Sequence, residues 1–342
     1  MSDVSPLTAA LLRLSQAPGV GTVLLRQALE QARRGTLPSD PLDLLPADVA
    51  EKAATSEEWV ASGDFLVGQL EAARRFQTRI IGPLDPEYPP ALRSNPDVPP
   101  VLYIRGMLMP FIQRSVAVIG TRHPTRHGAS TAWRLGRYFA EHACSVVSGL
   151  AVGCDTFAHG GALEAEGHTV AVLAHGLQTI APRENAGVAE AIVDGGGALV
   201  TEFPFGTKPA GFRYVQRDRT QAALSNGVVL VQSKQNGGSL HASRAALRYG
   251  RWLAVAGATE QDIADGAPVI EANQILTHGS DTEKSLLLRV SAEQLKHVHV
   301  LSGKSDYENL LPLLWRQDRA NDTELFNDAD DLARRALHRR EP

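Results

Sequence analysis

The chain has 342 residues, of which 43% are hydrophobic, with a formal net charge of −4 and two cysteines. Its length allows one large α/β domain with one or two small additional domains, and Cys144 and Cys154 make neither a disulfide framework nor a zinc site, because these need more cysteines at short paired spacings. No apolar run approaches the roughly 18 residues of a membrane span, and the first residues lack the basic start of a secretory signal, so we expect a cytoplasmic protein without a membrane span.

Residues 1–75 are rich in Ala and Leu at helical spacing, which predicts a small helical domain. Within this stretch the turn Gly19-Val20-Gly21 joins two apolar helical patterns and resembles a helix-hairpin-helix (SAM-like) module. The N–H groups of such a turn can approach a phosphate backbone. The turn itself has no Lys or Arg, so a packing role and a DNA contact both stay open.

Residues 76–285 show the pattern of an α/β domain. After a proline-rich connector, apolar runs alternate with helical stretches. The predicted strands lie near residues 101–106, 115–120, 144–148, 169–174, 197–201, 227–232 and 251–256. Runs of four to six apolar residues separated by helices are typical of a parallel sheet covered on both faces. We therefore predict an extended Rossmann-like, doubly wound and mainly parallel sheet.

The last part of the chain, residues 286–342, is polar. It contains the acidic run Asp328–Asp331 and the basic end Arg334–Arg340, and it has few glycines to mark turns. We expect loose helices and a frayed terminus there, and its role is unknown.

The first candidate anion site follows the strand near 115–120 and reads Gly120-Thr121-Arg122. In an open α/β sheet, ligands bind at the carboxyl ends of strands, where backbone N–H groups and a helix N-terminus favour an anion. Arg122 would add a fixed cation. The dinucleotide fingerprint G-x-G-x-x-G is broken by Arg122 and Thr125, so the turn predicts phosphate binding but not NAD binding.

A second turn follows the strand near 144–148 and begins with Ser148 and Gly149. We expect Asp155 to lie at the N-cap of the next helix, with His159 one turn further on. For these last two residues a structural role, as helix cap and buried histidine, and a functional role both stay open.

The segment that begins at Phe212 carries two arginines two residues apart, with aromatic residues just upstream. This pattern suits a phosphate backbone with a base stacked nearby. Alternatively, Arg217, Asp218 and Arg219 form an ion-pair network at the edge of the sheet.

A further turn, Gly237-Gly238-Ser239, opens a helix with a glycine nest and is a second anion cradle. The stretch 114–256 contains 14 Lys and Arg against 9 Asp and Glu. An acidic chain of this kind can therefore still present a basic face.

In their order and spacing, these motifs resemble the DNA-processing protein A (DprA/Smf) family over about residues 80–280. The matching segments are Tyr88-Pro89, Pro99–Gly106, Val118–Arg122, Ser148–His159, Gly176-Leu177, Pro182–Asn185, Glu202–Gly206, Arg217-x-Arg219 and Gly238–Leu240. Where that family usually has Arg-Asn-Arg, this chain has Asp218 between the two arginines.

The resemblance implies a protein without a catalytic step, a cofactor or a metal ion. It would bind single-stranded DNA on the extended Rossmann domain, form a homodimer, and load the RecA recombinase during natural transformation. The DNA-binding residues implied are Gly120, Thr121, Arg122, Ser148, Gly149, Lys208, Phe212, Arg217, Arg219, Gly238 and Ser239.

The alternative is a diverged Rossmann-fold nucleotide sensor or a nucleotide-processing enzyme. The related lysine-decarboxylase-like phosphoribohydrolases use a P-G-G-x-G-T-x-x-E turn, whose glutamate acts on the ribose. This chain has the segment Asn236–Ser243 at the comparable place, without a carboxylate. Hydrolysis therefore lacks its acid/base residue, whereas a sensor that only holds a nucleotide stays open.

Overall fold

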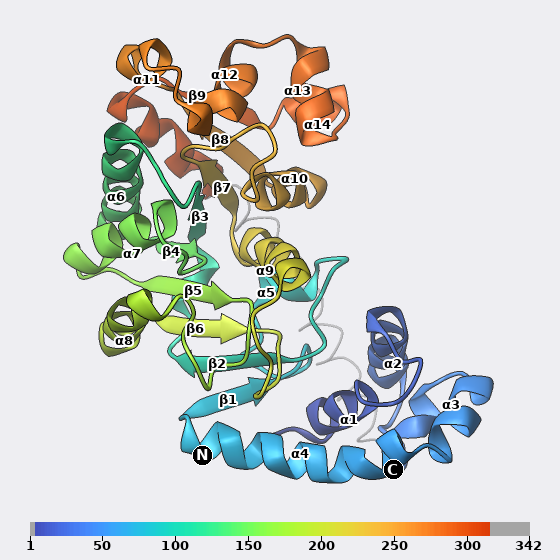
Figure 1. The fold of residues 1–342 in the computed structure, drawn as a ribbon. Helices are drawn as coiled ribbons and strands as arrows, with labels where there is room; N and C mark the ends of the chain where they lie inside the picture. Colours follow the sequence, from blue (N-terminus) through green and yellow to red (C-terminus); the bar gives the residue numbers. More distant parts are fainter. Residues whose placement is uncertain (1–3, 315–342) are drawn as a thin grey trace, which may run out of the picture.

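The computed structural model describes residues 4–314, and its centre is one nine-stranded sheet (Figure 1). The order of the strands is β1-β2-β6-β5-β4-β3-β7-β8-β9. Their bounds are β1 Thr78–Ile81, β2 Leu102–Gly106, β3 Ser115–Ile119, β4 Ser145–Ser148, β5 Thr169–Leu173, β6 Ala198–Thr201, β7 Gly227–Leu230, β8 Trp252–Ala256 and β9 Val298–Leu301. β2 is antiparallel to both of its neighbours, β1 and β6, and every other pair is parallel.

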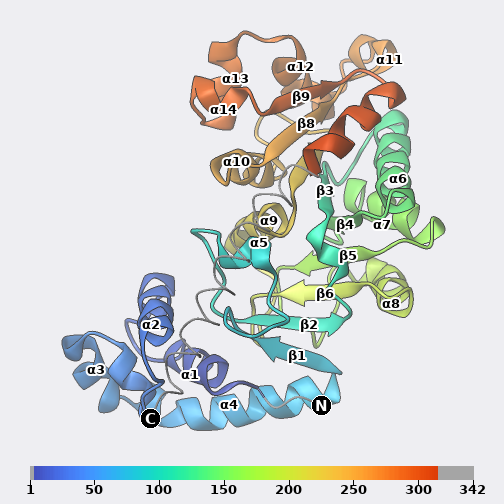
Figure 2. The same ribbon diagram turned by 180° about the vertical axis from the view of Figure 1, so that it is seen from behind.

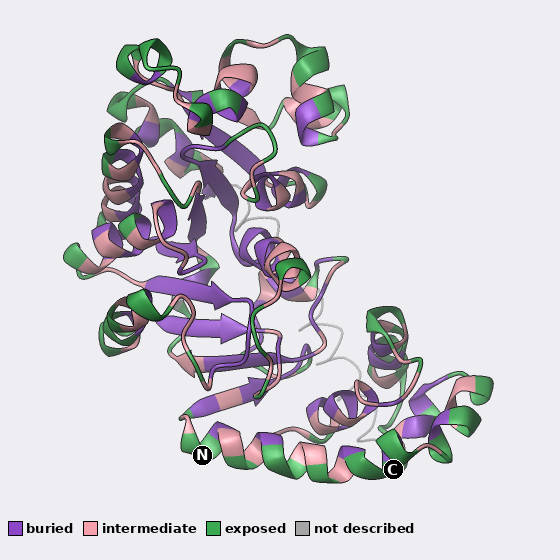
Figure 3. Ribbon diagram, in the orientation of Figure 1, coloured by how far each residue is buried: buried purple, intermediate pink, exposed green. Residues whose placement is uncertain are grey.

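This arrangement confirms the predicted doubly wound, mainly parallel α/β fold. Every residue of the six strands from β3 to β8 is buried (Figure 3), because helices cover both faces of the sheet. β3 pairs with β4 on one side and with β7 on the other. The winding therefore reverses between β3 and β7, and a ligand crevice is expected beyond the carboxyl ends of these two strands.

The helices form two layers. α6 Arg126–Glu141, α7 Cys154–Glu164 and α8 Ala186–Asp194 pack on one face, and α9 Gly211–Leu224 and α10 Leu240–Arg248 pack on the other (Figures 1 and 2). The shorter helices around the far edge are α11 Glu260–Ala264, α12 Glu271–His278, α13 Asp281–Leu288 and α14 Ala292–Leu295, and α5 Pro90–Arg93 precedes β2. Short 3-10 turns lie at Pro41–Leu44, Phe111–Gln113, Arg183–Asn185, Pro268–Ile270 and Lys304–Leu310. In the described part of the chain, no helix is both long enough and apolar enough to cross a membrane.

The N-terminal region consists of helices packed beside β1, as the Ala/Leu pattern predicts. The helices are α1 Pro6–Leu14, α2 Thr22–Arg34, α3 Ala47–Ala54 and α4 Glu57–Arg75. Ser5 caps α1 by accepting a hydrogen bond from the N–H of Thr8. The turn between α1 and α2 needs Gly19, whose φ is +79°. Two helices joined by a glycine turn therefore form the hairpin that the sequence suggests.

The stretch beyond residue 285 differs from its prediction in one respect. β9 pairs in parallel with β8 and adds a strand to the edge of the sheet, where the sequence pattern predicts helices only. Asp328–Asp331 and Arg334–Arg340 lie outside the described residues.

Candidate functional site

A pocket of about 360 Å³ opens at the carboxyl ends of β3, β4 and β7, at the reversal point of the sheet. Its walls are the loop after β3, the loop after β4, one face of α9, and the loop that leads from β7 into α10. The predicted residues that line it are Gly120, Thr121, Arg122, Arg217, Gly238 and Ser239. Both predicted anion cradles therefore face a single pocket, which we call the main pocket.

The loop after β3 is held by close backbone packing. A Cβ on Gly120 would lie 2.5 Å from Cys154 Sγ, so only glycine allows this approach. Thr121 N–H donates to the carbonyl of Gln232 at 2.8 Å. Arg122 is exposed, and its guanidinium lies 5.3 Å from the centroid of the Tyr214 ring. A cation thus stands at the mouth of the pocket, next to an aromatic ring.

Gln232, which no sequence motif points to, fixes the other end of this loop. Its Oε1 accepts a hydrogen bond from the N–H of Thr125 at 3.0 Å, and its Nε2 donates to Thr125 Oγ1 at 2.8 Å. Thr125 in turn caps α6 by accepting from the N–H of Gly128. The sequence signal for Gln232 is its position, because a polar side chain directly follows the apolar run of β7.

The second cradle is the turn before α10. Ser239 Oγ donates to Ser233 Oγ at 2.9 Å, and Ser233 N–H donates to Asn273 Oδ1 at 2.9 Å. Within residues 4–314, the backbone N–H groups of Gly238 and Ser239 have no hydrogen-bond partner. They are therefore free to bind an anion at the N-terminus of α10.

Arg217 forms the floor of the main pocket and is itself buried, with 6% of its side chain exposed. Its Nε lies 3.1 Å from Asp218 Oδ1, and its Nη1 lies 3.9 Å from Asp155 Oδ2. Nη1 also donates to the carbonyl of Val172 at 3.2 Å. The ion-pair alternative from the sequence therefore describes Arg217 and Asp218, although Arg219 takes no part in it.

Burial controls the protonation of the two carboxylates. It raises the pKa of Asp218 to about 6, against the opposing attraction of Arg217. Burial also raises the pKa of Asp155, and Arg217 again opposes the change. This part of the pocket therefore becomes more positive as the pH falls toward about 6, where Asp218 gains a proton.

Asp155 and His159 have structural roles in the fold, although Asp155 lies in the first turn of α7 and the N-cap residue is Gly153. Asp155 Oδ2 accepts hydrogen bonds from the N–H groups of Gly149 and Ala151, at 3.1 and 3.3 Å, and so holds the loop after β4. His159 is fully buried, and its Nδ1 lies 2.7 Å from Thr169 Oγ1. Burial lowers the pKa of His159 to about 3, which keeps the ring neutral.

Two predicted residues of the β4 turn do not line the main pocket. Ser148 is fully buried, and its Oγ donates to the carbonyl of Val118 at 2.7 Å. Its side chain is therefore used between β4 and β3, which differs from the predicted DNA contact. Gly149 acts by leaving space, because a Cβ there would lie 1.4 Å from Arg217 Nη1.

Lys208 and Phe212 lie at the exposed N-terminal end of α9, outside the lining of the pocket. Phe212 has 67% of its surface exposed. The guanidinium of Arg213 lies 4.8 Å from the centroid of the Phe212 ring and donates to the carbonyl of Lys208 at 2.7 Å. An exposed ring of this kind offers a surface on which a base can stack.

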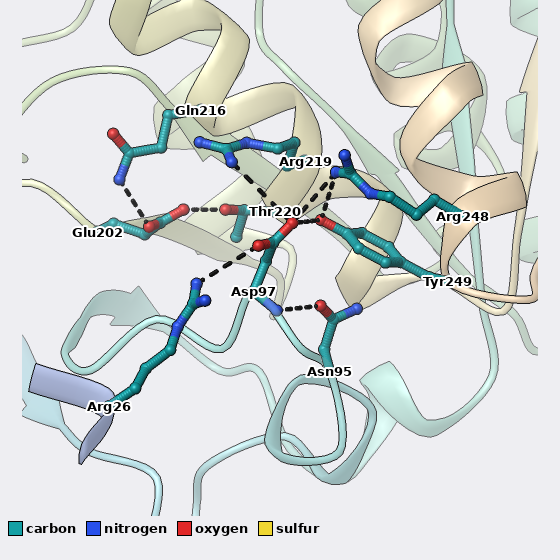
Figure 4. Close-up of polar contacts among 9 residues, drawn as sticks. All are labelled: Arg26, Asn95, Asp97, Glu202, Gln216, Arg219, Thr220, Arg248 and Tyr249. Carbon is teal, nitrogen blue, oxygen red and sulfur yellow. Dashed lines mark hydrogen bonds and ion pairs between the residues drawn. The ribbon is translucent and has the colours of Figure 1, made fainter. Parts of the chain in front are cut away.

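Arg219 does not share a pocket with Arg217, contrary to the prediction. Residues two apart on a helix point about 200° apart, so Arg219 faces a second pocket of about 260 Å³ on the other side of α9. There its Nη1 lies 4.0 Å from Asp97 Oδ2 (Figure 4). Among the described residues, no group of three or more His, Cys, Asp or Glu is placed to hold a metal ion.

Comparison with known proteins connects this geometry to a family. Residues 79–280 match the family model of the DNA recombination-mediator protein A. Protein Smf of Escherichia coli is 39% identical over 174 residues, which are 49% of this chain and 46% of that protein. The DNA processing protein DprA of Bacillus subtilis is 32% identical over 235 residues, 68% of this chain and 79% of that protein. The chain thus spans about half the length of the Escherichia coli relative.

Two solved structures have the same fold. The DNA processing protein A of Streptococcus pneumoniae superposes with a TM-score of 0.62 at 24% identity, over 79% of this chain and 97% of that one. The DNA processing protein A of Helicobacter pylori, which binds single-stranded DNA, gives a TM-score of 0.51 at 25% identity, over 63% of this chain and 98% of that one.

Proposed function

This chain belongs to the DNA recombination-mediator protein A family, and from that premise we propose that it binds single-stranded DNA in the main pocket. The observation that carries the proposal is the meeting of two anion cradles across one pocket. Arg122 supplies a cation on one side, and the free N–H groups of Gly238 and Ser239 supply donors on the other. Successive phosphates of one strand fit this arrangement.

Aromatic side chains next to the cradles favour a single strand over a duplex. Tyr214 lies in the lining of the pocket, and Phe212 stands exposed two residues before it. Unpaired bases can stack on such rings, whereas bases inside a duplex cannot. The Helicobacter pylori relative binds single-stranded DNA, which supports the same choice of ligand here.

For the role in the cell, we propose the one that the family resemblance implies. The protein acts in the cytoplasm during natural transformation, forms a homodimer, and hands its DNA to the RecA recombinase without a catalytic step of its own. Light scattering tests the dimer, and the rate at which RecA assembles on a coated single strand tests the transfer. A monomer, or a RecA rate that the protein does not change, would contradict these parts separately.

The direct test is fluorescence anisotropy with labelled oligonucleotides. We expect single-stranded DNA to bind more tightly than a duplex of the same sequence, with little sequence preference. Equal or tighter binding of blunt duplex DNA would contradict the proposal. Binding of a free nucleotide without binding of DNA would support the nucleotide sensor instead.

A further inference from the structure

Three arginines from three different helices gather around Asp97, on the face of α9 that points away from the main pocket (Figure 4). Arg248 Nη2 lies 3.1 Å from Asp97 Oδ2, Arg26 Nη2 lies 3.5 Å from Oδ1, and Arg219 Nη1 lies 4.0 Å from Oδ2. The Tyr249 hydroxyl also donates to Asp97. Because these arginines belong to α10, α2 and α9, this arginine cluster connects the helical region to the sheet.

The positive charge of the cluster is not balanced by the acids near it. One carboxylate cannot neutralise three guanidinium groups. The other acid of the second pocket, Glu202, accepts hydrogen bonds from Thr220 and Gln216, and burial raises its pKa. Within residues 4–314, the buried Nε atoms of Arg26 and Arg219 have no hydrogen-bond partner. Arg26 and Arg219 both line the second pocket of about 260 Å³, a setting that favours an anion.

Basic side chains on one face of α10 lie between this cluster and the main pocket. α10 begins at the Gly238-Ser239 cradle and ends at the arginine cluster, nine residues or about 14 Å further on. His241, Arg244 and Arg248 have the spacing i, i+3, i+7, which places them on one face of this helix. Burial lowers the pKa of His241, and nearby arginine charges lower it further. The lowered pKa keeps the His241 ring uncharged at neutral pH, so Arg244 and Arg248 supply the positive charge of this face.

The turn between α1 and α2 adds a smaller contribution. Thr22, the first residue of α2, lines the second pocket, and no side chain caps this N-terminus. Its partial positive charge therefore adds to that of the arginines.

We propose that the arginine cluster around Asp97 is a second phosphate-binding site for the same DNA strand. The strand leaves the main pocket along α10 and reaches the helical region at Arg26. In the free protein Asp97 holds the arginines, and a DNA phosphate competes with it. This inference rests on the proposed function, because it assigns a longer path to the same ligand. Arginine suits the role since its planar group binds phosphate oxygens in pairs.

Oligonucleotides of two lengths test the proposal. Arg248→Ala and Arg26→Ala should weaken binding of a strand of about 16 nucleotides by about tenfold and leave a strand of about 4 nucleotides unaffected. Each substitution should lower the slope of log K against log salt by about 0.7 for the long strand alone, because one phosphate is no longer neutralised. Arg137→Ala is the matched control, because Arg137 pairs with Glu141 on α6, away from both pockets.

Asp97→Asn separates a DNA site from a simple contact between the helical region and the sheet. If phosphate competes with Asp97, this variant should bind the long strand more tightly than the wild type does. Unchanged long-strand binding in Arg248→Ala and Asp97→Asn, with lowered melting temperatures, would overturn the proposal. The Arg248→Ala variant should still fold, because 57% of this side chain is exposed, so a loss of DNA binding can be separated from a loss of structure. Failure of the proposed function gives a different result, because the wild type would then bind neither length.

Discussion

Gly149 at the end of β4 leaves the space that the guanidinium of Arg217 occupies. A Cβ at this position would lie 1.4 Å from Arg217 Nη1 and 2.7 Å from Asp155 Oδ2. The absence of a side chain on one strand end therefore allows a buried cation to reach a carboxylate at the floor of the main pocket. In this way Gly149 contributes to the site without lining it.

Gly149→Ala should displace Arg217 and lower the free energy of unfolding by about 1–3 kcal/mol, the usual effect of overpacking. Chemical denaturation of the purified variant measures the change. Gly160→Ala is the control, because Gly160 lies inside α7 with no atom within 4 Å of the added Cβ. That substitution should be neutral or raise stability by up to about 1 kcal/mol. Equal effects of the two substitutions would contradict this role of Gly149.

Arg122 and Arg217 should respond differently to removal, because one is exposed and the other is buried. Arg122→Ala should weaken single-strand binding, lower the salt slope by about 0.7 and leave the melting temperature unchanged. Arg217→Ala leaves two buried carboxylates without their cation and should lower stability by about 3 kcal/mol or more. A salt titration of anisotropy together with thermal melts measures both effects. A destabilised Arg122→Ala, with an unchanged slope, would mean that Arg122 is structural.

Most of the sheet could be predicted from the sequence, because each central strand is a short apolar run bounded by turns and covered by helices. The strands at the two edges, β1 and β9, were not predicted, and β9 shows why. It lies at the edge, only one of its four residues is buried, and His299 interrupts its apolar character. A strand of this kind is stabilised by its pairing with β8, which local sequence does not show.

The candidate site could be predicted in part. In a parallel sheet the carboxyl ends of the strands lie at one edge. The sequence therefore predicts that the loops containing Gly120 and Gly237 lie close together. Which side of α9 faces the main pocket depends on how that helix packs, so the sequence does not show that Arg219 faces the second pocket. Asp97 could not be found, because its partners Arg26 and Arg248 are 71 and 151 residues away in the chain.

Gln232 should act as a positioning residue for the loop that carries Arg122. Gln232→Ala removes two hydrogen bonds to Thr125, one of them to its backbone N–H. We expect a decrease of about 1–3 kcal/mol in stability and weaker single-strand binding, because the loop is no longer held. Gln235→Ala, at an exposed position in the same segment, should change neither. Full DNA affinity in Gln232→Ala would show that the loop keeps its shape without this side chain.

Asp218 should make both stability and DNA binding depend on pH. Its pKa is raised to about 6 by burial, whereas an unfolded aspartate titrates near about 3.9. The folded state therefore binds the proton more tightly. Between about pH 4 and pH 6 this group lowers stability as pH rises, by about 2–3 kcal/mol in total. At neutral pH the charged carboxylate is disfavoured and also repels a phosphate in the main pocket.

Asp218→Asn removes this titration while it keeps the size of the side chain. The variant should be at least as stable as the wild type at neutral pH, because the burial of the charge opposes folding more than Arg217 favours it. It should also bind single-stranded DNA more tightly at pH 7.5, with an affinity that no longer rises as pH falls toward about 5. Denaturation and anisotropy across this pH range measure both effects. Asp194→Asn, at an exposed carboxylate at the end of α8 and outside the pocket lining, serves as the control. A less stable Asp218→Asn with unchanged DNA affinity would mean that the ion pair with Arg217 serves the fold alone.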